Sequence, residues 1–260
     1  MVTIAAAGDV HAGAHDASRV RDLFANVSEE ADILLLAGDL TRHGTPDEMR
    51  AVASALFTLT IPVVTIFGNH DVHAGQERVC RKMLEDAGAI VLEREVATLT
   101  IRGTTIGVAG AKGFGGGFRG ACASEFGEPE MRQFLAPTVA YGEFFARSLA
   151  DLDTDVRIAL MHYAPIPETL LGERWEIFPF LGAYQLGEAL DAGGADLALH
   201  GHAHRGAEFG STATGVPVRN VAQVVLGRPY GLYEVEPVRR TMRVPAGPHL
   251  VQGAMGHRPS

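Results

Sequence analysis

The stretch DILLLAGDLTRHGTPDE, residues 32–48, decides the fold. It begins with an unbroken apolar run at 32–37, which is typical of a strand buried on both faces. A Gly-Asp pair ends that run. The tetrapeptide TPDE at 45–48 then places a capping threonine, a proline and a glutamate where a helix begins. A buried strand that leads directly into a helix predicts a β/α unit.

Similar units lie on both sides of this stretch. Apolar runs predict strands, and apolar residues at helical spacing predict helices. The predicted strands are 2–7, 32–37, 63–67, 96–101, 104–109, 156–161, 196–199, 207–209, 218–225 and 231–235, and the predicted helices are 20–27, 46–56, 77–87, 138–152 and 184–192. Alternating buried strands and helices predict a layered α/β domain, and the late strands without helices predict a second sheet stacked on the first.

Composition excludes several classes of protein. The chain has 260 residues, of which 47% are hydrophobic, and only two cysteines, so it is neither disordered nor a disulfide scaffold. The formal net charge of −9 argues against a nucleic-acid surface. No apolar run is long enough for a membrane helix and no leader peptide is visible, so we expect a cytoplasmic protein. We expect one domain over 1–236 and a Pro/Gly/Arg-rich tail over 237–260, and the sequence leaves a homo-oligomer open.

Two segments interrupt the regular pattern. Residues 111–135 are rich in glycine and lack periodicity, which predicts a long mobile loop over one face of the sheet. The connection at 163–183 carries aromatic residues and prolines. Both segments are candidates for the walls of a substrate pocket.

Polar residues follow the predicted strands at their carboxyl ends. These residues are Asp9, His11, Asp39, Asn69, His70, His162, His202 and His204. In an open α/β sheet, ligands bind at that edge, so segments distant in sequence can converge on one small volume. Asp, Asn and His side chains are ligands for Mn, Fe and Zn, and the absence of cysteine argues against a structural zinc site.

The succession GDVH, GDLTRHG, GNHD, MHYAP and GHAH resembles the five sequence blocks of the calcineurin-like metallophosphoesterases. The match runs in the right order from residue 8 to residue 204. The resemblance implies a metallophosphoesterase-like, four-layer α/β/β/α sandwich. It also implies two divalent or trivalent metal ions, Mn, Fe or Zn, which lie about 4 Å apart in two-metal sites.

Motif position implies a role for each site residue. The first metal would be bound by Asp9, His11, Asp39 and His204, and the second by Asp39, Asn69, His162 and His202. Asp39 would therefore bridge the two ions, and a bridging hydroxide would complete both coordination spheres. His70 would act as a catalytic residue that protonates the leaving alkoxide or stabilises the transition state. Asp71 would orient His70 or hold the turn.

The sequence favours a phosphodiesterase over a protein phosphatase. The Ser/Thr phosphatases of the superfamily carry GDxxDRG, with an arginine that grips the phosphoryl group, whereas this chain has GDLTRHG at 38–44. The longer stretch GDLTRHGTPDE is similar to small bacterial phosphodiesterases. We therefore expect hydrolysis of a small phosphodiester. The alternatives are a phosphomonoesterase or nucleotide pyrophosphatase that uses the same site, and a non-catalytic protein-interaction module on the same fold.

Overall fold

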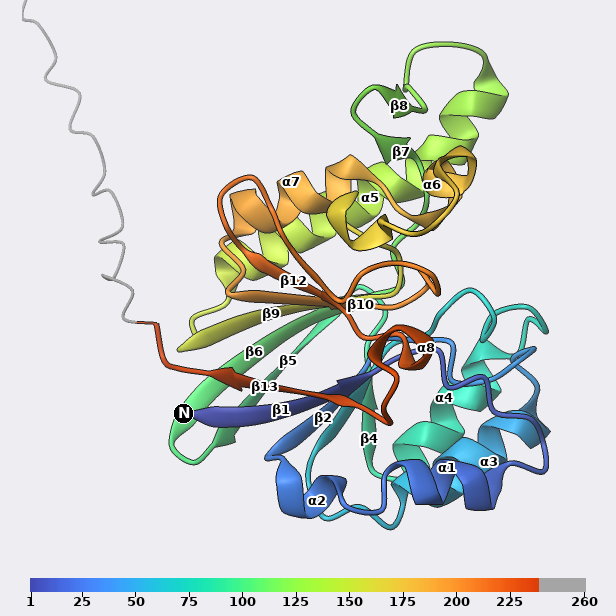
Figure 1. Ribbon diagram of the computed structural model, residues 1–260, viewed down its shortest axis with the longest axis vertical. Coiled ribbons are helices and arrows are strands. Elements are labelled where there is room, and N and C mark those ends of the chain that lie inside the picture. The colour runs from blue at the N-terminus through green and yellow to red at the C-terminus, as the bar shows by residue number, and fades with distance from the viewer. Residues whose placement is uncertain (239–260) are drawn as a thin grey trace, which may run out of the picture.

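Two large β-sheets lie face to face in the computed structural model, which describes residues 1–238 (Figure 1). Helices cover the outer face of each sheet, which confirms the α/β class and the four-layer α/β/β/α sandwich. Most of the predicted tail, residues 237–260, lies outside the described residues. None of the helices within 1–238 is long and apolar enough to cross a membrane.

The first sheet has five strands in the order β13-β1-β2-β3-β4. Its strands are β1 (Val2–Ala7), β2 (Ile33–Leu36), β3 (Val63–Thr65), β4 (Ala89–Val91) and β13 (Gly231–Val235). The first four run parallel, and β13 pairs antiparallel with β1. The carboxyl ends of β1, β2 and β3 therefore meet at one edge.

The second sheet has six strands in the order β11-β12-β10-β9-β6-β5. Its strands are β5 (Glu95–Ile101), β6 (Thr104–Ala111), β9 (Val156–Met161), β10 (Leu197–His200), β11 (Phe209–Ser211) and β12 (Pro217–Asn220). The central strands β6, β9, β10 and β12 run parallel, and β5 and β11 pair antiparallel at the two edges. The pairing of Ile101 with Thr104 confirms the predicted hairpin turn at Arg102-Gly103.

The helices form the two outer layers. The helices that follow strands of the first sheet are α1 (Ala17–Leu23), α2 (Val27–Glu30), α3 (Pro46–Leu56) and α4 (Glu77–Asp86), and the second sheet is covered by α5 (Pro129–Asp151) and α7 (Tyr184–Gly193). The predicted capping box of α3 is present. The Thr45 hydroxyl accepts a hydrogen bond from the Glu48 N–H, and the Glu48 carboxylate accepts one from the Thr45 N–H.

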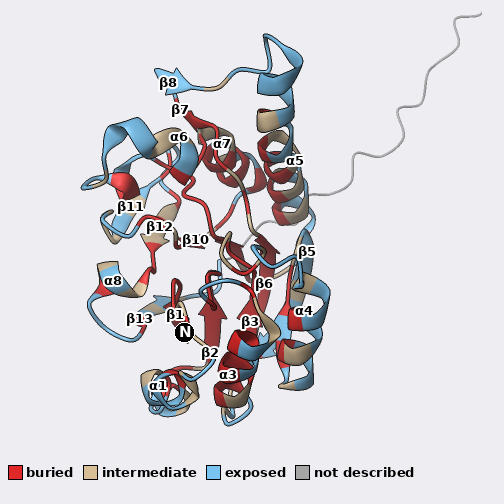
Figure 2. Ribbon diagram, turned by 90° about the vertical axis from the view of Figure 1, so that its right-hand side faces the viewer, coloured by how far each residue is buried: buried red, intermediate tan, exposed pale blue. Residues whose placement is uncertain are grey.

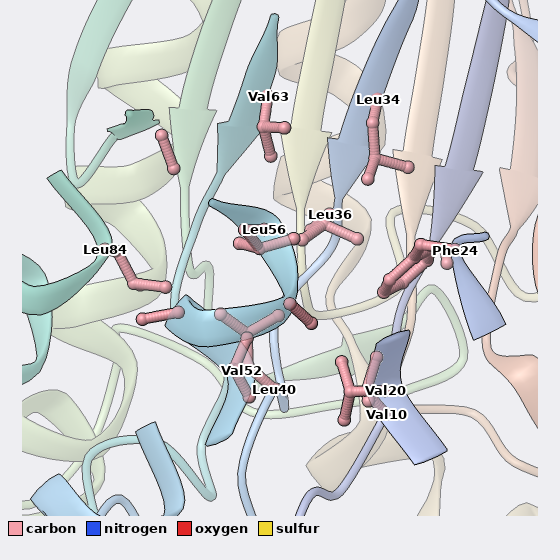
Figure 3. Packing of buried hydrophobic residues seen from close by; sticks show 14 of the residues in the cluster. Val10, Val20, Phe24, Leu34, Leu36, Leu40, Val52, Leu56, Val63 and Leu84 are labelled. Atoms are coloured by element: carbon pink, nitrogen blue, oxygen red, sulfur yellow. The ribbon is translucent and has the colours of Figure 1, made fainter. Parts of the chain in front are cut away.

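Alternate residues of β2 pack into two different hydrophobic cores. Leu34 and Leu36 pack towards α3 and α4, whereas Ile33 and Leu35 pack towards the second sheet. Figure 3 shows Leu34 and Leu36 with side chains of the covering helices. This division follows from the two-residue period of a strand, and it explains why the run at 32–37 is apolar throughout. Figure 2 shows the result as buried strands between largely exposed outer helix faces.

The predicted mobile loop at 111–135 is partly wrong. The structure has a small hairpin of β7 (Gly117–Phe118) and β8 (Ala121–Cys122), and α5 begins at Pro129 rather than at residue 138. Proline is well suited to the first turn because no N–H donor is needed there. A second proline at 137 removes a hydrogen bond within the helix, and the burial of Leu135 and Thr138 offsets that loss.

Some secondary-structure elements in the last part of the described chain also differ from the predicted ones. The predicted strand at 218–225 is β12 followed by a turn of helix, α8 (Gln223–Leu226), because a short apolar run fits a buried helix as well as a strand. The predicted strand at 231–235 exists as β13, but it joins the first sheet rather than the second. The connection at 163–183 contains two short 3₁₀ turns and α6 (Phe178–Leu181).

Candidate metal centre

All seven predicted metal ligands follow strands whose carboxyl ends meet where the two sheets approach each other. Those ligands come from the ends of β1, β2 and β3 in the first sheet, and of β9 and β10 in the second. Backbone hydrogen bonds join neighbouring loops at this edge: the Asp9 N–H donates to the Gly38 carbonyl (3.0 Å) and the Gly201 N–H to the His162 carbonyl (3.2 Å). The convergence expected from the sequence is therefore present.

The ligands predicted for the first metal form one cluster. One ligand atom from each of Asp9, His11 and His204 lies within 4.8 Å of the others. The Nε2 atoms of His11 and His204 are 3.5 Å apart, and the Nε2 of His204 is 2.8 Å from Oδ1 of Asp9. Two imidazole nitrogens that face each other beside a carboxylate fit a shared cation.

The ligands predicted for the second metal form another cluster around His162. Its Nε2 lies 2.9 Å from Oδ1 of Asn69 and 3.3 Å from Oδ1 of Asp39, and His202 contributes a third metal-binding group within 4.8 Å. The other oxygen of Asp39, Oδ2, lies 3.8 Å from Nε2 of His11. Asp39 thus presents one oxygen to each cluster, which is the arrangement that a bridging carboxylate requires.

Backbone carbonyl groups fix the orientation of two of these imidazoles. Nδ1 of His162 lies 2.8 Å from the Ala37 carbonyl, so its Nε2 is the nitrogen directed at the centre. Nε2 of His202 lies 3.1 Å from the Phe180 carbonyl, which leaves Nδ1 for a cation. Contacts of this kind hold metal-binding histidines in one tautomer. The Phe180 contact was not predicted, because a backbone acceptor leaves no trace in residue type.

Several predicted ligands have a strained backbone. Six non-glycine residues within 1–238 have a positive φ, and four of them are predicted ligands: Asp9 (59°), His11 (45°), Asp39 (50°) and His202 (70°). L-residues seldom adopt this conformation, and such strain concentrates at functional sites. The backbone geometry therefore marks the same place as the sequence motifs.

Two motif glycines make room for the carboxylates. A Cβ atom at Gly68 would overlap Oδ1 of Asp39, and one at Gly201 would overlap Oδ2 of Asp9. The structure shows that the space they leave is filled by the side chains of Asp39 and Asp9.

Electrostatics at the centre favour a bound cation. Burial opposes the charge of Asp39, but its ion pair with His162 keeps the pKa of Asp39 well below its usual range. Burial likewise opposes a charge on His162, but Asp39 raises the pKa of His162 to about 9. Burial lowers the pKa of His202 to about 3, so that ring is neutral, as a metal ligand must be. Two buried carboxylates and four imidazoles are a suitable set for Mn, Fe or Zn.

The predicted catalytic residue His70 lies beside both clusters. Its Nδ1 is 2.7 Å from the Arg42 carbonyl, and its Nε2 is 3.9 Å from Oδ2 of Asp39. Its backbone N–H donates to Oδ1 of Asp39 (2.8 Å). The ring also packs edge-on against His11, with centroids 4.7 Å apart. The side chain of His70 is partly exposed at this place, beside the two clusters.

The contacts of Asp71 support the turn-holding role over the orienting role. Its fully buried carboxylate accepts hydrogen bonds from the N–H groups of Leu40 (3.1 Å), Thr41 (2.9 Å) and Gly68 (2.9 Å), and from the Thr41 hydroxyl (2.7 Å). No hydrogen bond joins the carboxylate to the His70 ring among the described residues. Asp71 ties the turn after β2 to the turn after β3.

Replacing Asp71 with alanine is expected to lower the free energy of unfolding by about 3 kcal/mol, because several buried donors lose their acceptor. Urea denaturation of the metal-free protein measures this change. Asp86→Ala, which removes an exposed carboxylate, is the matched control. An Asp71→Ala protein as stable as the wild type would show that this carboxylate does not hold the two turns together.

The fold and the two His/Asp clusters define a metal-dependent phosphoester hydrolase. The family model for calcineurin-like phosphoesterase matches residues 2–206, and the chain belongs to that family. No curated protein sequence matches the chain.

Solved structures show the same fold at low sequence identity. The phosphopantetheinyl hydrolase of Mycobacterium tuberculosis is 15% identical over 85% of this chain and 88% of its own, with a TM-score of 0.57. A Staphylococcus aureus protein described as a 5'-nucleotidase, crystallised with alpha-ketoglutarate, is 15% identical over 84% of this chain and 48% of its own, with a TM-score of 0.54. GAP50, the anchor in the inner membrane complex of Plasmodium, is 12% identical over 86% of this chain and 72% of its own, with a TM-score of 0.53.

Proposed function

We propose that this chain is a phosphodiesterase that hydrolyses a small phosphodiester at a centre of two metal ions. Asp9, His11, Asp39 and His204 would hold the first ion, and Asp39, Asn69, His162 and His202 the second. The observation that carries this proposal is the placement of Asp39, which directs one oxygen towards each cluster. When bound, two such cations lower the pKa of water and stabilise the charge of an in-line displacement.

The protein residues prepare the site for that chemistry. The His70 N–H donates to Oδ1 of Asp39 (2.8 Å) and holds that carboxylate in place, and the His202 N–H donates to both oxygens of Asp9 (3.2 and 3.0 Å). Nδ1–H of His70 donates to the Arg42 carbonyl, so the imidazolium form of the ring, protonated at both nitrogens, would give its Nε2 proton to the departing alkoxide and become neutral.

The charge around the site favours a diester over a monoester. A phosphodiester carries one negative charge, whereas a phosphomonoester near neutral pH carries up to two. Arg42, in the loop after β2, is paired with Asp16 (3.2 Å), and Arg119, in the turn between β7 and β8, is paired with Glu188. Neither arginine is therefore free to match the second charge that a monoester carries on its phosphoryl group itself.

The Mn²⁺-loaded protein is expected to hydrolyse bis-p-nitrophenyl phosphate with a kcat/KM about tenfold higher than that for p-nitrophenyl phosphate, because the second charge of the monoester is unmatched. A tenfold ratio corresponds to about 1.4 kcal/mol in the barrier. Release of p-nitrophenol measures both rates. The reverse order of rates would reject the diesterase and favour the phosphomonoesterase. Hydrolysis of neither ester would favour the interaction module.

A further inference from the structure

Lys112 leaves the second sheet beside the predicted metal ligand His162. Strands β6 and β9 are parallel, and Ala111 lies opposite Met161, so the residues that follow emerge together at the same edge. The Lys112 carbonyl accepts hydrogen bonds from the N–H groups of His162 (3.0 Å) and Tyr163 (3.2 Å). Lys112 therefore has a fixed position next to the candidate metal centre.

The ammonium group of Lys112 lies among aromatic rings. Its Nζ is 5.1 Å from the ring centroid of Tyr163, 5.2 Å from that of Phe114 and 5.9 Å from that of Tyr141. Within residues 1–238, the only hydrogen-bond acceptor that contacts Nζ is the Gly113 carbonyl, at 3.3 Å. An ammonium group has three donors, so two of them remain for a ligand.

The nearby carboxylate of Glu93 does not form an ion pair with this ammonium group. Its Oε1 accepts a hydrogen bond from the Tyr141 hydroxyl (2.9 Å), and its Oε2 accepts one from the backbone N–H of Lys112 (3.1 Å). No described carboxylate oxygen lies within 4.0 Å of Nζ. Burial lowers the pKa of Lys112, and the charges of Glu93 and Asp39 oppose that shift. A largely desolvated cation without an anionic partner favours binding of an anion.

The Tyr163 ring contacts both Lys112 and a residue of the candidate metal centre. The Tyr163 ring that contacts Lys112 also packs against His202, with centroids 4.4 Å apart. Further rings lead away from the centre: Phe114 packs on Tyr163, and Phe134 lies between Phe114 and the exposed Phe180. A substrate with its phosphoryl group at the metals would extend along this wall and pass the ammonium group.

We propose that Lys112 binds an anionic oxygen group on the alcohol portion of the substrate, so that the preferred phosphodiesters carry a second negative charge beyond the scissile phosphoryl group. This inference rests on the proposed function and specifies its substrate class. The second anion is a carboxylate or a phosphate-like group, since both offer oxygen acceptors to an ammonium donor.

A second lysine of the chain provides a matched control. The only two lysines of the chain are Lys82 and Lys112. Lys82 is exposed on α4 and pairs with Asp86 at 2.7 Å, remote in the fold from the metal-binding edge. Reagents that modify amines therefore report on these two side chains and on the amino terminus alone.

The first test compares three chromogenic diesters with Mn²⁺-loaded protein: p-nitrophenyl ethyl phosphate, its 3-carboxypropyl analogue and its 3-phosphonopropyl analogue. The wild type is expected to prefer at least one anionic ester over the ethyl ester in kcat/KM, and the larger ratio identifies the anion. Lys112→Ala is expected to lower that ratio about tenfold, mainly through KM, and Lys112→Arg to restore part of it. Lys82→Ala is expected to match the wild type. A ratio that Lys112→Ala leaves unchanged would overturn the inference while the diesterase function stands.

A second measurement does not depend on turnover. The lysines of the Mn²⁺-loaded wild type are acetylated to a trace level in the presence of either 4-phosphonobutyrate or propylphosphonate. Mass spectrometry then measures the labelling of each lysine. We expect 4-phosphonobutyrate to slow the labelling of Lys112 several-fold more than propylphosphonate does, with Lys82 unaffected. Equal protection by the two compounds would contradict the inference, even for a protein that hydrolysed none of the three esters and so lacked the proposed function.

Discussion

Replacing Asp39 with alanine is expected to remove both metal ions and to lower the rate of diester hydrolysis by a factor on the order of 10³ or more. The carboxylate directs Oδ1 towards His162 and Oδ2 towards His11, so its removal takes one oxygen from each cluster. Elemental analysis after dialysis, together with the rate, measures the effect.

Asp47→Ala is the control for that experiment, because Asp47 is an exposed carboxylate paired with Arg50 on α3. It is expected to keep two metal ions and the wild-type rate. An Asp39→Ala protein that still held two ions would exclude a bridging role for this residue.

Replacing His70 with alanine is expected to leave the metal content unchanged and to lower kcat by about 10²- to 10⁴-fold, the usual contribution of a general acid. The ring reaches the centre through Nε2, while Nδ1 is held by the Arg42 carbonyl. Elemental analysis and steady-state kinetics on the same preparation separate binding from turnover.

His73→Ala is the matched control, because the His73 ring packs against that of His70, with centroids 4.7 Å apart, without being part of either cluster. We expect it to retain most of the wild-type activity. The metal content of His70→Ala also tests whether His70 is itself a metal ligand. One nitrogen of His70 lies within 4.8 Å of metal-binding atoms of His11 and Asp39. Loss of a metal ion in His70→Ala would identify His70 as a ligand and contradict its assignment as a proton donor.

Much of the fold could be predicted because local signals and burial agree. The helix at 46–56 carries its own capping box, and the hairpin at 101–104 carries its own turn. Prediction was wrong where distant packing decides the outcome. Nothing local requires α5 to continue through Pro137, and the joining of β13 to β1 depends on residues more than 200 positions away. The apolar run at 218–225 has no period that separates strand from helix.

The candidate site was predictable to a similar degree. Residue type and the placement of polar side chains after strands led to seven candidate ligands, which the structure brings together. The carbonyl groups that orient His162 and His202 were not predictable, because every residue carries the same backbone. The aromatic surroundings of Lys112 were equally hidden, since Phe114, Tyr141 and Tyr163 come from three separate segments.

Anomalous diffraction from crystals soaked in Mn²⁺ tests the central claim most directly. Two peaks are expected about 4 Å apart. Asp39 should lie between them, with Asp9, His11 and His204 around one peak and Asn69, His162 and His202 around the other. Absence of peaks at this edge, or a single ion held by other side chains, would contradict the claim that these seven residues form a binuclear centre.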